Sequence, residues 1–294
     1  MNEQNCIAPN ECSTRRWIVT LVVGFVLATV TSLPFYPLMQ NTTDSFMGIP
    51  FATLFTVISF IPQFICILIA IKFIAKTPIK NFLFGNGGEI NKKSCLIVFV
   101  LFIIGFYLPL LISLENVKVN QVDVGHFCFA LAFFLVTIFI QTTFEELIFR
   151  GIFIRCACKN NIGYSKRAWI AYAICSVLFA VSHASNPEVT SQQGIEVVFS
   201  LVAYIVPATA YFIADLHFGS LLPGIIMHWA NNFMLSTIVN GEISALNSSV
   251  LLTDTSPTTG ASLLLSSVLT HAPIFIYIII DCIRRKMAAS KSAK

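Results

Sequence analysis

The sequence predicts an all-α membrane protein, a bundle of about eight transmembrane helices. Of its 294 residues, 56% are hydrophobic and only 11% are charged, whereas soluble domains carry about 25% charged residues. Apolar runs of about twenty residues, the length that spans a bilayer, recur along the chain. The basic residues gather in alternate connections between those runs. The nine cysteines form no C-x-x-C pair, which argues against a zinc knuckle or a disulfide framework.

Eight apolar runs are expected to cross the membrane. They are residues 17–39, 50–71, 95–114, a fourth from 127, then 168–183, 195–214, 220–239 and 261–283. The first run is too long for the core of a signal peptide, so we interpret it as a retained span. The fourth run either ends at Arg150 or continues to Cys158 as a long or bent helix. A tight turn, 215–219, is expected between the sixth and seventh spans.

The basic residues fix the predicted orientation. Of eighteen lysines and arginines, only Lys118 falls on the far side and only Arg150 within the membrane. Cytoplasmic connections carry the excess of Lys and Arg, so both termini are expected in the cytoplasm. The net charge of +4 follows from this topology and is no sign of a nucleic-acid partner; the expected surroundings are membrane lipid.

Three charged residues stand within one of the most apolar regions, Phe144 to Arg150. Each costs roughly 2.5–3.5 kcal/mol at membrane depth on insertion scales. Glu146 and Arg150 are four residues apart and are predicted to pair on one helix face. Glu145 points about 100° away, which leaves its carboxylate free for chemistry.

Other spans supply groups that are able to meet Glu145. The fifth contains Phe179 and, one turn later, His183; the seventh contains His228 and, one turn later, Asn232. Intramembrane polar residues usually face the bundle interior and mark function. We interpret the three remaining histidines, His126, His217 and His271, as packing or boundary residues.

Depth constrains this hypothesis. If the fourth span ended at Arg150, His183 would lie about 24 Å deeper than Glu145 at a rise of ~1.5 Å per residue. The two side chains meet only if the fourth helix continues to about Cys158, or if the fifth begins deeper than Ala168. The sequence therefore predicts one of these two arrangements.

The three motifs, Glu145-Glu146-x-x-x-Arg150, Phe179-x-x-x-His183 and His228-x-x-x-Asn232, resemble those of the CPBP family in the same order. This family of CAAX-protease-like and bacteriocin-processing (Abi) membrane proteins includes the CAAX-prenyl endopeptidases. The resemblance covers about residues 140–235. It implies a catalytic core at 127–239, preceded by a cytoplasmic tail, 1–16, and three helices, 17–126. An outer loop, a last helix and a basic tail, 240–294, follow.

The resemblance implies an intramembrane endopeptidase, a metalloendopeptidase or a glutamate-dependent hydrolase, in a bacterial plasma membrane. Glu145 would activate water with help from His183, while His228 and Asn232 would hold the oxyanion; Glu146, Arg150 and Phe179 would support them. Apolar surroundings make a carboxylate a stronger base, and donors in a water-poor cavity stabilise developing negative charge. The implied substrate is a membrane-associated peptide or protein, of a prenylated or bacteriocin type.

Three alternatives remain open from the sequence. Zinc held by Glu145, His183 and His228 is one, although no H-E-x-x-H is present; we favour the reaction without a metal. A non-enzymatic family member, a bacteriocin self-immunity factor or a membrane scaffold, is the second. A proton-coupled transporter is the third, which the absence of repeated halves disfavours.

Overall fold

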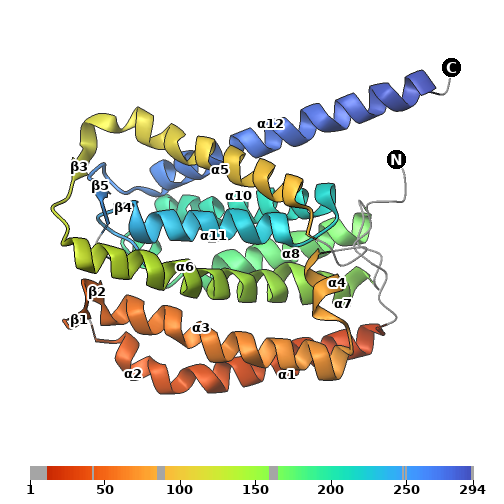
Figure 1. Ribbon diagram of the computed structural model, residues 1–294, viewed down its shortest axis with the longest axis horizontal. Coiled ribbons are helices and arrows are strands. Elements are labelled where there is room, and N and C mark those ends of the chain that lie inside the picture. Colours follow the sequence, from red (N-terminus) through yellow and green to blue (C-terminus); the bar gives the residue numbers. More distant parts are fainter. Residues whose placement is uncertain are drawn as a thin grey trace.

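The computed structural model describes residues 12–41, 43–84, 90–158, 165–246, 248 and 250–292. Most of the predicted N-terminal tail, Lys159 and the last two residues lie outside this part. The chain folds as an all-α bundle whose long helices run back and forth between two ends (Figure 1). The helices are α1 (Thr14–Ser32), α2 (Tyr36–Met39), α3 (Phe51–Ala70), α4 (Ile79–Phe84), α5 (Lys92–Ile112), α6 (Val124–Glu146), α7 (Ile154–Cys158), α8 (Lys166–Ser182), α9 (Pro187–Thr190), α10 (Ile195–Phe218), α11 (Leu222–Thr237) and α12 (Gly260–Ser292).

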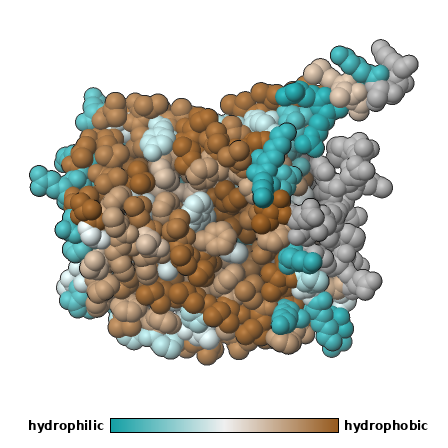
Figure 2. Space-filling view, viewed as in Figure 1, coloured by the Kyte–Doolittle hydropathy of each residue, from teal (hydrophilic) through white to brown (hydrophobic). Residues whose placement is uncertain are grey.

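Among the described residues, six segments are long and apolar enough to cross a membrane: Thr14–Met39, Phe51–Ala75, Lys92–Ile112, Val124–Cys158, Ile195–Phe218 and Gly260–Lys291. Hydrophobic side chains cover the flank of the bundle in Figure 2, and polar residues gather toward its two ends. In water such a surface would be unfavourable, because the free-energy cost of exposing apolar side chains grows with the apolar area in contact with water. The chain is therefore a polytopic integral membrane protein.

The two remaining predicted spans form shorter helices. α8 has 17 residues and α11 has 16 residues, so each is about 25 Å long at ~1.5 Å per residue. Along α8, Ile170, Ile174, Val177 and Val181 are exposed at helical spacing, which gives that helix an apolar outer stripe. α11 is instead largely buried between α5, α6 and α10.

The fourth span is a single long helix, the first of the two arrangements that the depth argument allows. α6 continues through a π-helical segment, Leu147–Phe153, into α7, and the whole span covers 35 residues. A π turn leaves backbone carbonyls without their usual helical partners. Cys175 donates to the carbonyl of Phe149 (Sγ–O 2.7 Å), and Arg155 donates to that of Gly151 (Nη1–O 3.0 Å).

Short strands close one end of the bundle. β1 (Ser45–Phe46) pairs antiparallel with β2 (Ile49–Pro50). β5 (Leu252–Asp254) is the centre of a three-stranded sheet, with β3 (Val117–Val119) antiparallel and β4 (Val239–Gly241) parallel to it. This sheet ties together the connections on the side opposite to the start of α1 and the end of α12 (Figure 1). Lys118 lies in β3, at that opposite end.

The predicted turn at 215–219 is wrong. α10 continues through Phe218 and ends at Gly219, whose φ of 73° is the left-handed conformation that suits glycine at a helix end. Asp215 is therefore a buried helical residue, 2% exposed, and not part of a loop. The polar residues that favoured a turn are held instead by contacts with distant elements.

Candidate active site

The two glutamates lie at the end of α6, in a stretch where every residue from Gln141 to Ile148 is buried. Glu146 is 0% exposed, whereas Glu145 keeps 8%. Adjacent residues on a helix point about 100° apart, so the two carboxylates enter different surroundings. The two carboxylates therefore differ in their access to water.

Glu146 is neutralised by two partners. Its carboxylate forms the predicted ion pair with Arg150 one turn later, and both side chains are buried. Its Oε1 also lies 2.6 Å from Nδ1 of His228 on α11. A carboxylate paired with arginine is ionised and accepts, so Nδ1 of His228 donates this bond.

Glu145 makes fewer contacts. Its Oε1 accepts a hydrogen bond from Nε2 of Gln141, at 3.3 Å, one turn earlier on α6. Its Oε2 lies 3.5 Å from Nε2 of His228 and has no hydrogen-bond partner among the described residues. One oxygen of Glu145 is therefore held by Gln141, and the other has no hydrogen bond among the described residues.

His228 is clamped between the glutamates and two aromatic rings. Tyr211 of α10 stacks on its imidazole, with centroids 5.3 Å apart and planes 22° apart. Phe179 of α8 meets it edge-on at 5.9 Å. The ring is 4% exposed, so its orientation is fixed by packing as well as by hydrogen bonding.

Arg150 links this cluster to the start of α11. Its guanidinium lies over the Tyr211 ring, 5.1 Å from the centroid, and its Nε is 3.9 Å from Oδ2 of Asp215. Oδ1 of Asp215 in turn accepts a hydrogen bond from the backbone N–H of Gly224 at 3.0 Å. A Cβ at Gly224 would meet that carboxylate at 2.7 Å, so a larger residue here would have to displace Asp215 from its present position.

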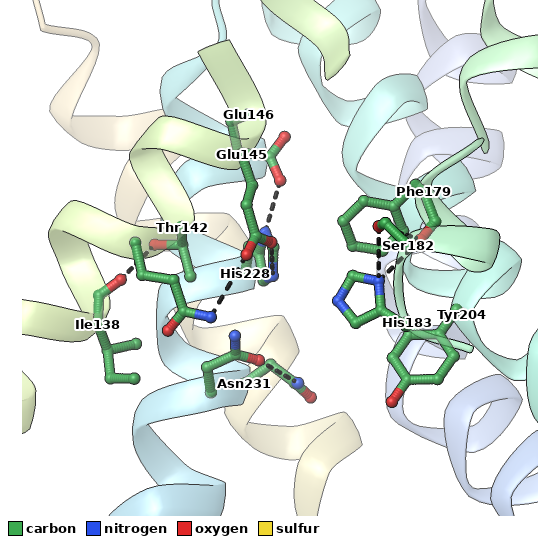
Figure 3. Close-up of polar contacts among 12 residues, drawn as sticks. Ile138, Thr142, Glu145, Glu146, Phe179, Ser182, His183, Tyr204, His228 and Asn231 are labelled. Carbon is green, nitrogen blue, oxygen red and sulfur yellow. Dashed lines mark hydrogen bonds and ion pairs between the residues drawn. The ribbon is translucent and has the colours of Figure 1, made fainter. Parts of the chain in front are cut away.

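His183 stands opposite the glutamates. It directly follows the last residue of α8, and its Nδ1 lies 2.7 Å from the carbonyl of Phe179, to which it donates. Its ring contacts those of Phe179 and Tyr204, each with centroids 4.4 Å away. Figure 3 shows the imidazole directed toward Glu145 and His228, with no hydrogen bond joining them. Nε2 of His183 makes no hydrogen bond to the glutamates and faces the space that separates the ring from them, where a water or a substrate could bind.

Asn232 lies one turn beyond His228 on α11, as predicted. Its Oδ1 accepts a hydrogen bond from Nδ2 of Asn231 at 3.0 Å. Within the described part of the chain, its own amide nitrogen has no hydrogen bond to another residue. That nitrogen is a donor available to a ligand.

The zinc set inferred from the sequence is not assembled in this geometry. Among the described residues, no group of three His, Cys, Asp or Glu side chains is arranged to hold a metal ion. Nδ1 of His228 faces Glu146 and its Nε2 faces Glu145, while His183 stands apart. Because these donors do not converge on one point, we derive no step through zinc.

Sequence reasoning missed four residues of this network: Gln141, Glu188, Tyr204 and Asp215. For Gln141 a signal existed, since it stands four residues before Glu145 in an apolar run. Asp215 was assigned to a turn because a charge at the end of an apolar run resembles a boundary. Tyr204 resembles ordinary packing, and Glu188 a solvated loop residue.

The other histidines have partners of their own. Nε2 of His217 lies 3.0 Å from Oδ2 of Asp281, which also accepts from Arg285, so this residue joins α10 to α12. Nδ1 of His271 donates to the carbonyl of Ser267 at 2.8 Å. His217 therefore makes a structural contact between α10 and α12, whereas the His271 ring also meets Tyr211 of the cluster edge-on at 5.6 Å.

The fold and the cluster define a polytopic helical membrane protein with two carboxylates, two histidines and an asparagine gathered from three helices of the bundle. The profile of the family described as "Type II CAAX prenyl endopeptidase Rce1-like" matches residues 127–234. This part of the chain is an Rce1-like type II CAAX prenyl endopeptidase domain of the CPBP family. The predicted resemblance is thereby confirmed. A comparison with curated proteins finds no match.

Proposed function

We propose that the protein is an intramembrane endopeptidase in which Glu145 activates the attacking water. The observation that carries this proposal is the asymmetry of the two glutamates. Glu146 is fully buried, and its Oε1 pairs with Arg150 and accepts from His228. Glu145 forms no ion pair with an arginine or lysine among the described residues and keeps 8% exposure. Oε2 of each glutamate has no hydrogen bond among those residues, but only that of Glu145 belongs to a side chain with some access. A base needs a free lone pair and room for water.

The proposed reaction is hydrolysis of one peptide bond. Glu145 takes a proton from water as the oxygen forms a bond to the scissile carbonyl carbon, which gives a tetrahedral oxyanion. Glu145 then gives that proton to the amide nitrogen, the C–N bond breaks, and an amine and a carboxylic acid leave. The site residues end in their starting state, so no further reactant is consumed.

His183 is proposed to assist the base from the opposite side of the site. With Nδ1 donating to the Phe179 carbonyl, Nε2 accepts a hydrogen bond from the water and orients it toward the substrate. This role requires a water or substrate between His183 and Glu145, consistent with the absence of a direct bond in Figure 3.

Asn232 and His228 are proposed to stabilise the oxyanion. The unused amide N–H of Asn232 donates irrespective of protonation state. Because Nδ1 of His228 donates to Glu146, its Nε2 donates only when the ring carries two hydrogens. Asn232 is therefore the more constant donor of the two, and donors held in a water-poor site are worth far more than in water.

The proposed setting is a membrane crossed eight times, with both termini in the cytoplasm. The short helices α8 and α11 add two crossings to the six long spans, which gives eight. Successive helices run in opposite directions through the bundle (Figure 1). α1 begins and α12 ends at one end of the bundle, where α3 with its lysine-bearing π segment also ends and α8 begins. The substrate is a membrane-associated peptide or protein, as the match to a protease family implies.

The test is cleavage of membrane-inserted peptides by the purified full-length protein in lipid vesicles. Wild type should release fragments, and Glu145→Gln should not, while its melting temperature stays unchanged because the amide still pairs with Gln141. Glu115→Gln removes an exposed glutamate on a connection and serves as the matched control. Equal cleavage by wild type and Glu145→Gln would refute the proposal.

A further inference from the structure

A tyrosine outside the three sequence motifs packs directly on His183. Tyr204 of α10 stacks on the imidazole with centroids 4.4 Å apart and planes 29° apart, and Figure 3 shows the two rings together. Its hydroxyl donates a hydrogen bond to Oε1 of Glu188 at 2.5 Å. Nδ2 of Asn186 donates to the same hydroxyl at 2.9 Å.

Glu188 connects this tyrosine to the loop after α11. It lies in α9, and its second oxygen, Oε2, accepts a hydrogen bond from the backbone N–H of Ala245 at 3.0 Å. Both carboxylate oxygens are therefore engaged, one by Tyr204 and one by the loop. A continuous set of contacts runs from Ala245 through Glu188 and Tyr204 to the His183 ring.

His183 needs such support because of its place in the fold. It stands after the last residue of α8, with φ −97° and ψ 2°, so helical backbone geometry does not fix its side chain. The bond from Nδ1 to the Phe179 carbonyl fixes which nitrogen carries the hydrogen. The plane of the ring is set by its aromatic neighbours, Phe179 and Tyr204.

We propose that Tyr204 is a positioning residue that holds His183 toward Glu145, and that Glu188 holds Tyr204 in place from the loop at Ala245. This inference rests on the proposed function, because it assigns Tyr204 a role through a catalytic His183. Tyr204 is not itself an acid in the reaction, since its hydroxyl hydrogen is directed to Glu188. Misplacing a reacting group by about 1 Å can cost roughly 100-fold in rate.

The first experiment compares cleavage rates of full-length variants in vesicles. Tyr204→Leu removes the ring and should lower kcat about 10–100-fold, with KM changed by less than about twofold. Tyr204→Phe keeps the ring but loses the hydrogen bond to Glu188, so its loss of kcat should be smaller than that of Tyr204→Leu. Glu188→Ala breaks the same bond and should lower kcat by a similar amount to Tyr204→Phe. Tyr172→Phe is the matched control, because that buried tyrosine bonds Thr209 with its hydroxyl and stacks on Phe212, away from the cluster.

A double-mutant cycle separates positioning from general packing. If Tyr204 acts through His183, Tyr204→Leu should have no further effect on kcat in the His183→Ala background. A loss of equal size in both backgrounds overturns the inference and leaves the proposed function intact. A wild-type rate of cleavage in His183→Ala would instead contradict the proposed function. So would the absence of cleavage by the wild-type protein as well as by the variants.

A chemical measurement tests the positioning without activity. Diethyl pyrocarbonate modifies accessible imidazole nitrogens, and mass spectrometry reports each site separately. Modification of His183, relative to His126 near the start of α6, should rise several-fold in Tyr204→Leu and stay at the wild-type level in Tyr172→Phe. Equal rates at His183 in wild type and Tyr204→Leu would overturn the inference even if no substrate is ever found.

Discussion

Replacing Arg150 by alanine is expected to destabilise the whole bundle. Arg150 is 3% exposed, pairs with a fully buried Glu146 and lies 3.9 Å from buried Asp215. Its removal takes away the cation that is paired with Glu146 and that faces Asp215, in an apolar interior. Breaking one buried pair by removing a partner costs about 3–5 kcal/mol. At about 1.4 kcal/mol for each factor of ten, the unfolding equilibrium should shift by between two and four orders of magnitude.

The chain offers a matched control for this prediction. Arg285 pairs with Asp281 at the same i,i+4 spacing, but its side chain is 55% exposed, and exposed helix pairs contribute only about 0.3–0.5 kcal/mol. Unfolding of purified Arg150→Ala, Arg150→Lys and Arg285→Ala would be followed in detergent by heating, together with the yield of monodisperse protein. Arg150→Lys should be intermediate, because it restores the charge without the planar fork. Equal melting temperatures for Arg150→Ala and Arg285→Ala would refute the reasoning.

Three further predictions address the chemistry and the topology. Asn232→Ala should lower turnover about 10²–10³-fold, as loss of one oxyanion donor does, with KM unchanged in initial-rate measurements; a change in KM alone would contradict that role. Strong chelators should leave cleavage intact and metal analysis of active protein should find clearly substoichiometric zinc, since the candidate donors do not converge; stoichiometric zinc lost together with activity would favour the metalloprotease alternative. Reporter fusions after Lys294 and within 240–260 should report opposite sides of the membrane, and the same side for both would contradict the eight-span topology.

The part of the site that was predictable from the sequence is the part built on single helices. Glu146 and Arg150 are four residues apart, and this spacing alone places them together. The depth argument leaves two arrangements open, a fourth helix that continues to about Cys158 or a fifth that begins deeper than Ala168, and the 35-residue fourth span is the first of them. In both cases helix geometry converts sequence distance into spatial distance.

Contacts between distant segments escaped the same reasoning. Asp215 meets Arg150 across 65 positions and caps the start of α11 through Gly224, and no local pattern distinguishes it from a turn residue. Tyr204 and Glu188 are 16 residues apart in the sequence, on separate elements whose approach depends on the loop between α8 and α10. Such contacts depend on how whole helices pack against one another. The spacing of apolar residues along one helix carries no information about that packing.

His228 is the point at which the structural and the proposed catalytic halves of the cluster meet. Nδ1 faces Glu146, the glutamate paired with Arg150, while Nε2 faces Glu145, the glutamate that keeps some exposure. The imidazole of His228 is rigid and its two nitrogens face different carboxylates. Its bond to Glu146 therefore also fixes the position of the nitrogen that faces Glu145. Adjacent carboxylates would otherwise repel each other in an apolar interior. The sequence Glu145-Glu146 is tolerated because one imidazole and one guanidinium divide the pair into a fixed and an available member.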